Sequence, residues 1–186
     1  MAGSGKKTFV TMKDFMELAI QFEKESSAFY TEMKGLVADR AVVDLMGKLA
    51  AQEQDHAKTL SAYSAPAGDE TTLQFGPDLS ISMPAPPDDP TLSNMLAVAI
   101  EREGKTAQIY HAAASRSAGE FRDMIEALAG FEEEHEDRLK RLQAAYSSDK
   151  SDEADGAARG VSQPIYTKLA RPESTAGGAD QPTETP

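Results

Sequence analysis

An internal repeat that places charged residues inside apolar helical stripes is the strongest constraint on the fold. A shift of 80 residues superposes residues 19–30 on 99–110, with Ala, Ile, Glu and Tyr matched to their own types. A shift of 79 residues superposes 49–60 on 128–139 and matches Leu, Glu, His and Leu. The helical period points the Glu and His side chains inward, where an unpaired charge costs several kcal/mol. A chain that keeps such residues twice needs a partner for them inside the fold.

Apolar residues recur with the 3.6-residue period of an α-helix in four segments, so we predict four helices. They are expected at about residues 11–36, 39–63, 91–117 and 117–146. Two of the starts resemble capping boxes, Thr11 with Asp14 and Ser117 with Glu120. The fourth helix is therefore expected to begin at Ser117.

The connections between the predicted helices differ in length. The first and third are only a few residues long, which makes each pair of helices an antiparallel hairpin. The second, at about residues 64–90, is rich in Pro and Gly, so no continuous helix is expected there. The fold class is thus predicted as all-α: a ferritin-like four-helix bundle at 11–147, made of two repeated helical hairpins joined by a long crossover.

Both ends of the chain are expected to lie outside this domain. Residues 1–10 are predicted to be a flexible N-terminus. Residues 148–186 are rich in Ser, Asp, Gly, Ala, Pro and Thr, and such a segment cannot bury enough apolar surface to offset its ordering entropy. We predict a disordered tail there, in which the apolar patch 161–169 either docks on a partner or the bundle, or has no role.

Six repeated side chains are candidate metal ligands. A Glu and a His three residues apart lie on one helix face, so the two E-x-x-H motifs can each converge on one point. The set is Glu23, Glu53, His56, Glu103, Glu132 and His135. Four carboxylates and two imidazoles suit two cations bridged by carboxylates. Oxygen-rich ligation in a chain without cysteine favours two iron ions, with manganese as an alternative. This donor set is the known pattern of ferritin-like di-iron proteins.

Other residues have ordinary readings beside functional ones. A single E-x-x-H is more often a solvated pair than a metal site, so the prediction of a metal site depends on the repeated set of six residues. His111 has no repeat equivalent, which favours a surface or hydrogen-bonding role. Tyr30 and Tyr110 each follow a candidate Glu by seven residues and either fill the core or orient a ligand of the opposite hairpin by a hydrogen bond.

Taken together, the motifs resemble the rubrerythrin family within the ferritin-like superfamily. The twofold E-x6-Y consists of Glu23/Tyr30 and Glu103/Tyr110, the twofold E-x-x-H consists of Glu53/His56 and Glu132/His135, and the resemblance covers about residues 11–146. It implies a non-haem di-iron site, a homodimer, and reduction of peroxide or oxygen as the activity. Because the chain has no cysteine, it lacks the rubredoxin domain of full peroxidases. The electrons are therefore expected from an external donor protein.

One position departs from the peroxidase pattern. Thr106 stands where those peroxidases carry an additional Glu, and the remaining six ligands are closer to the ferroxidase pattern of bacterioferritin. Two further functions therefore stay open. The chain could be a ferritin-like protein that oxidises and hands on iron, or a non-catalytic metal-binding module whose tail recruits a partner.

Charge and hydropathy restrict the partners and the location. The formal net charge of −12 argues against nucleic-acid binding, which needs clustered Lys and Arg. No apolar run approaches the roughly 20 residues that cross a bilayer, so no membrane partner is expected. Without cysteines or a signal-peptide pattern, we expect a cytoplasmic location.

Overall fold

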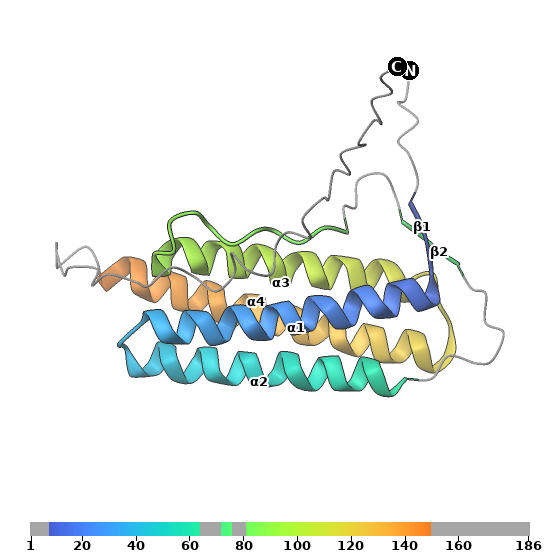
Figure 1. Cartoon of the computed structure of the whole chain (residues 1–186), viewed down its shortest axis with the longest axis horizontal. Helices are drawn as coiled ribbons and strands as arrows, with labels where there is room; N and C mark the ends of the chain where they lie inside the picture. The colour runs from blue at the N-terminus through green and yellow to red at the C-terminus, as the bar shows by residue number, and fades with distance from the viewer. Residues whose placement is uncertain (1–7, 64–71, 76–80, 150–186) are drawn as a thin grey trace, which may run out of the picture. The chain divides into compact units, whose positions relative to one another are not determined.

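The computed structural model describes residues 8–63, 72–75 and 81–149. The elements follow in the order β1 (Thr8–Thr11), α1 (Met12–Leu36), α2 (Arg40–Ala62), β2 (Thr72–Phe75), α3 (Leu92–Ala114) and α4 (Gly119–Asp149). Within the described residues, four helices account for most of the structure, as the predicted all-α class requires. In Figure 1, α1 lies along α2 and α3 lies along α4, and residue contacts also join α1 to α3 and α2 to α4.

Side-chain caps explain where three of the helices begin. The hydroxyl of Thr11 accepts a hydrogen bond from the Asp14 backbone N–H at 3.1 Å, which is the first half of the predicted capping box. The carboxylate of Asp39 accepts from the Ala41 N–H at 2.7 Å, and Thr91 caps α3 in the same way as Thr11 caps α1. Each such cap typically contributes about 1 kcal/mol.

The predicted capping box at Ser117 is wrong. Helix α3 already ends at Ala114, and the hydroxyl of Ser117 donates to the carbonyl of Ala113 at 2.8 Å, closing the end of α3. Helix α4 begins at Gly119, whose φ of 63° lies in the left-handed region that glycine adopts without steric cost. Glycine therefore makes the turn between the two helices.

A two-stranded antiparallel sheet was not expected from the sequence. In it Thr8 pairs with Phe75 and Thr11 pairs with Thr72. Residues 8–10 thus form a strand inside the segment predicted to be flexible, and the connector 64–90 contains the other strand. The remainder of the N-terminal segment, residues 1–7, and tail residues 150–186 lie outside the described part of the chain. The sheet joins the connector to the start of α1.

The directions of the helices follow from where the buried side chains lie. One apolar cluster takes residues from the N-terminal halves of α1 and α4 and from the C-terminal halves of α2 and α3. Its members include Phe15, Phe22, Leu60, Tyr110, Phe121, Ile125 and Leu128. Residues buried outside this cluster, such as Met33, Leu49, Met95 and Leu139, occupy the opposite halves. In every helix the buried Glu or His residues fall between the two groups, so they form a layer between apolar regions.

The sheet gives a test of the fold. Leu73 of β2 is completely buried and belongs to the apolar cluster. Leu73→Ala is expected to lower the free energy of unfolding by roughly 2–5 kcal/mol, the usual range for such a truncation. Urea unfolding followed by circular dichroism measures the change, with Gln74→Ala of the same strand as the control. Equal stabilities of the two variants would show that β2 does not contribute to the core.

Candidate metal centre

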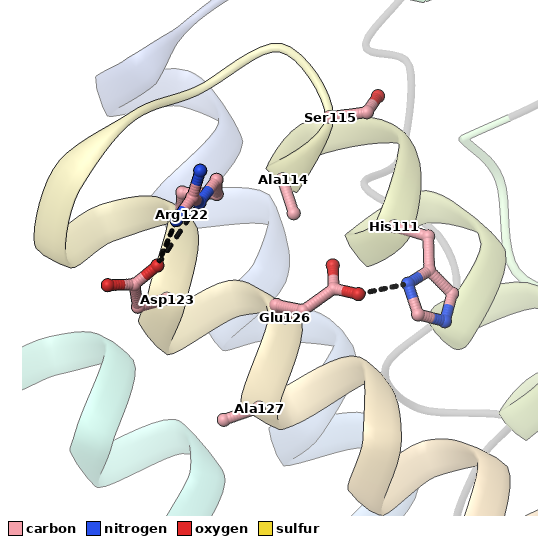
Figure 2. A pocket seen from close by; sticks show the side chains of 7 residues that line it. All are labelled: His111, Ala114, Ser115, Arg122, Asp123, Glu126 and Ala127. Atoms are coloured by element: carbon pink, nitrogen blue, oxygen red, sulfur yellow. Dashed lines mark hydrogen bonds and ion pairs between the residues drawn. The ribbon is translucent and has the colours of Figure 1, made fainter.

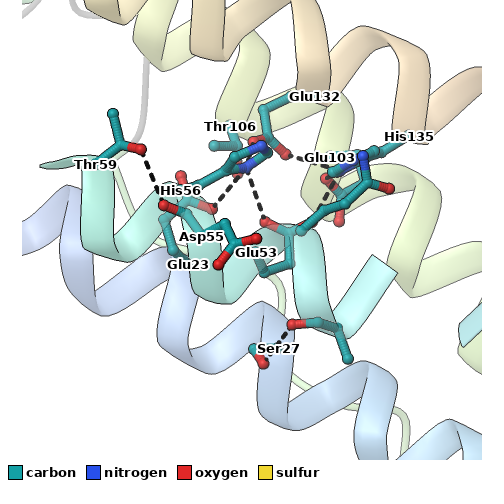
Figure 3. Close-up of polar contacts among 12 residues, drawn as sticks. Glu23, Ser27, Glu53, Asp55, His56, Thr59, Glu103, Thr106, Glu132 and His135 are labelled. Atoms are coloured by element: carbon teal, nitrogen blue, oxygen red, sulfur yellow. Dashed lines mark hydrogen bonds and ion pairs between the residues drawn. The ribbon is translucent and has the colours of Figure 1, made fainter. Parts of the chain in front are cut away.

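All six predicted ligand side chains are buried and lie together, although they come from four helices (Figure 3). Helices α1 and α3 each contribute one glutamate, Glu23 and Glu103. Helices α2 and α4 each contribute a Glu and a His spaced by three residues, which one helix face presents together. The repeat therefore predicted the place of these side chains correctly, while their role as ligands stays a prediction.

The six side chains form two overlapping groups of four. One group is Glu23, Glu53, His56 and Glu132, and the other is Glu53, Glu103, Glu132 and His135. Within each group the potential ligand atoms all lie within 4.8 Å of one another. Glu53 and Glu132 belong to both groups, so each has the position of a carboxylate shared between two cations. The other four residues belong to one group each.

Each imidazole faces three carboxylates with the same nitrogen. Nδ1 of His56 lies 3.7 Å from Oε2 of Glu23, 3.6 Å from Oε2 of Glu53 and 3.1 Å from Oε1 of Glu132. Nδ1 of His135 lies 2.8 Å from Oε1 of Glu53 and 3.6 Å from one oxygen each of Glu103 and Glu132. The two rings stack with their centres 5.5 Å apart. The two halves of the centre thus repeat one arrangement around the shared carboxylates.

Many polar atoms in this layer are buried and make no hydrogen bond of good geometry, although some lie at ion-pair distance from a neighbour, as Nδ1 of His135 does at 2.8 Å from Glu53. They include both oxygens of Glu53, Oε2 of Glu103, Oε1 of Glu132 and Nδ1 of both histidines. A buried polar atom without a partner costs about 1–3 kcal/mol, and more when it is charged. When deprotonated, these atoms offer lone pairs to a cation, and carboxylate oxygen with imidazole nitrogen suits iron or manganese. The residues present therefore fit a bound metal ion.

Burial and mutual repulsion shift the ionisation of the centre. The pKa of Glu23 is raised to about 8, chiefly by burial and also by the neighbouring Glu53 carboxylate, against the lowering effect of His56. Burial and the neighbouring carboxylates also raise the pKa of Glu132 well above its usual value. For His56 burial favours the neutral ring, but the three surrounding carboxylates outweigh it and raise the pKa to about 11. Protons thus offset part of the negative charge of the carboxylates. A bound cation would displace these protons and offset the charge in their place.

Two tyrosines connect α1 and α3 through the candidate ligands. The hydroxyl of Tyr30 on α1 donates to Oε1 of Glu103 on α3, and the hydroxyl of Tyr110 on α3 donates to Oε1 of Glu23 on α1. Both rings are buried, so they also fill the core. The cross-hairpin bonds that the E-x6-Y spacing suggested are present. Each holds one oxygen of a glutamate that belongs to a single group.

A buried arginine next to the centre was missed by the sequence reasoning. Arg102 donates through Nη1 to the carbonyl of Pro84 at 3.0 Å, and its guanidinium lies over the ring of Phe29. The repeat aligns Arg102 with Phe22, a core residue. An arginine at a position that is apolar in the other repeat could have indicated from the sequence that this side chain is buried. The side chain fastens the connector to α3.

The third histidine lies outside the centre, as its lack of a repeat equivalent suggested. His111 borders a surface pocket of about 770 Å³ between α3 and α4 (Figure 2). Its Nε2 lies 3.0 Å from Glu133 and its Nδ1 lies 3.3 Å from Glu126. The bond to Glu133 raises the pKa of this imidazole. These are the contacts of a surface ion pair.

Comparisons of the chain with protein-family models, with curated proteins and with solved structures found no match. Within the described residues, no helix is long and apolar enough to cross a membrane. What the centre can do chemically is therefore derived from its own residues.

The two overlapping groups predict how many ions each variant retains. The chain is expected to bind two Mn(II) ions. Glu23→Ala is expected to retain one, because Glu23 serves a single group, whereas Glu53→Ala is expected to lose high-affinity binding of both. Equilibrium dialysis with elemental analysis measures the retained metal. The control is Glu133→Ala, which removes an exposed carboxylate next to Glu132 and should leave two ions. Identical losses in the Glu23 and Glu53 variants would contradict the shared role of Glu53.

Proposed function

We propose that this protein is a non-haem di-iron oxidoreductase of rubrerythrin type, which reduces peroxide or oxygen with electrons from an external donor protein. The observation that carries the proposal is the pair of overlapping Glu/His groups that share Glu53 and Glu132. Such sharing suits two ions held close together by bridging carboxylates. One ion would use only one of the two groups, whereas the chain presents both, each with its own histidine.

The fold we propose is the ferritin-like four-helix bundle of two hairpins with one crossover. Its support is that α1 and α4 run away from the apolar cluster while α2 and α3 run towards it. The connections within each pair are short, and the segment between Ala62 and Leu92 is long. In this class of bundle, Glu and Glu-x-x-His side chains project into the core from facing helices.

Iron is the proposed metal, with manganese as the alternative, because the donors are mostly oxygen with a minority of imidazole. When bound, a pair of iron ions supplies the electron transfer to peroxide or oxygen. The chain's own residues hold and orient that pair. Glu53 and Glu132 would be shared, while Glu23 with His56 and Glu103 with His135 would complete the two ends.

The surroundings of the ligands fix their geometry and exclude water. Tyr30 and Tyr110 each hold one oxygen of a terminal glutamate by donating a hydrogen bond to it. A hydrogen bond to the carboxylate fixes which oxygen remains for the metal, and such supporting contacts usually tune metal affinity. The apolar regions on both sides of the layer separate it from solvent.

A second candidate function, iron oxidation and handling of the ferritin type, is favoured by Thr106. Its hydroxyl donates to the carbonyl of Arg102 at 3.0 Å and lies 3.9 Å from the sulfur of Met83 in the connector. No carboxylate of the peroxidase type stands here, and the hydroxyl is a poor iron ligand. His56 is therefore expected to keep its place in both oxidation states of the metal.

The two functions differ in their preferred oxidant. The iron-loaded protein is expected to react with both peroxide and oxygen, and its preference for peroxide should be smaller than that of Thr106→Glu. Stopped-flow oxidation by matched concentrations of each oxidant measures the preference. Thr106→Val controls for loss of the hydroxyl, and Met83→Ala combined with Thr106→Glu provides space for the larger side chain.

Either of two results would refute part of this account. A strong preference for peroxide that Thr106→Glu leaves unchanged would show that the missing carboxylate does not decide the oxidant. A protein that binds iron but reacts with neither oxidant would refute the redox function.

A further inference from the structure

The two halves of the centre differ in how they meet the surface. His56 is 7% exposed, whereas its repeat equivalent His135 is 0% exposed. The ring of Phe131 on α4 stacks on His56, with the ring centres 5.3 Å apart and the planes at 27°. Phe131 itself is 44% exposed, one of the two large apolar side chains that are exposed among the described residues. In the repeat the equivalent of Phe131 is Gln52, so the second hairpin carries an aromatic ring where the first carries an amide.

A pocket of about 440 Å³ leads to the His56 half. It lies between α2 and α4 and is lined by Gln52, Asp55, His56, Thr59, Met124, Ala127, Leu128 and Phe131. Only His56 and Leu128 in this lining are buried, so they form its floor. Neither Glu103 nor His135 lines it. The α2 wall is mostly polar and the α4 wall is apolar.

The α3 side of the centre is covered instead. There the connector lies on α3, with Pro84 bound by Arg102 and Met83 in contact with Thr106. Both Arg102 and Thr106 are buried. The described part of the connector thus closes the side of Glu103, and the α2–α4 face retains the pocket.

We infer that hydrated divalent cations enter and leave the centre at its His56 end, through this pocket, with Phe131 as the lid. The inference rests on the proposed two-metal centre and specifies the order of exchange at it. An ion held by Glu23 and His56 lies behind one imidazole and a half-exposed ring. In the part of the chain that the structure describes, Glu103 and His135 line no such pocket, so an ion held there would leave only after the first. The two ions therefore exchange at different rates, although their ligand sets are equivalent.

Metal extraction measures this difference directly. The full chain is loaded with two Mn(II) ions and mixed with an excess of chelator, and the release is followed in a stopped-flow instrument. We expect two phases of equal amplitude. Phe131→Ala should accelerate the fast phase on the order of five- to tenfold, since one aromatic contact over the ring is lost. Phe131→Trp should slow it, and Phe9→Ala, which removes a ring that is 64% exposed elsewhere, should change nothing.

The inference is overturned if both ions leave in a single phase. It is also overturned if Phe131→Ala behaves like Phe9→Ala. Two bound ions with equal release rates would refute the route and leave the proposed centre standing. A chain that binds no metal would refute the centre, and the pocket is then tested by a measurement that needs no metal.

The absence of cysteine from the chain permits that second measurement. Leu128→Cys places a thiol in the floor of the pocket, and Leu49→Cys places one at the repeat-equivalent, fully buried position. Methyl methanethiosulfonate should modify the thiol at 128 faster than that at 49. Adding Phe131→Ala should accelerate only the first, which separates an opened pocket from a loosened fold. Equal rates at the two positions, or equal acceleration of both, would overturn the route.

Discussion

The burial of four carboxylates and two imidazoles in one layer is the constraint on which the rest of the structure depends. Such a layer is costly unless its charges are balanced, and in each group of four the potential ligand atoms lie within 4.8 Å of one another. Protons balance part of the charge, as the raised pKa of Glu23 indicates. Two cations would balance all of it, because four carboxylates carry the charge of two divalent ions.

The surrounding fold supports this layer from three directions. Apolar side chains lie above and below it, so the helices associate without help from the charged residues. Tyr30 and Tyr110 cross between α1 and α3 and hold the terminal glutamates. The connector covers α3 through Arg102, and the pocket beside His56 lies on the opposite face. A centre that is covered on one side and accessible on the other suits exchange of metal or oxidant.

The sequence predicted those features of the structure that depend on helical periodicity and on the internal repeat. Helix ends within a few residues, and the meeting of six ligand candidates, follow from the 3.6-residue period and from the matched E-x-x-H motifs. Spacing could not tell that Glu53 and Glu132 belong to both groups, because that depends on how the four helices face one another. The two strands were not predicted because each has only four residues, too few to show a clear alternating pattern. The cap predicted at Ser117 was wrong because Gly119 makes the turn before α4. Long-range contacts, such as that of Arg102 with Pro84, leave no periodic signal.

The central claim is that two ions share Glu53 and Glu132, and electron paramagnetic resonance of the Mn(II)-loaded protein tests it most directly. Two Mn(II) ions joined by bridging carboxylates are coupled, so their hyperfine lines appear at half the spacing of a single ion. We expect this coupled spectrum from the parent chain and its loss in Glu53→Ala. A six-line spectrum of isolated Mn(II) at full loading would contradict the shared carboxylates, and with them the two-metal centre.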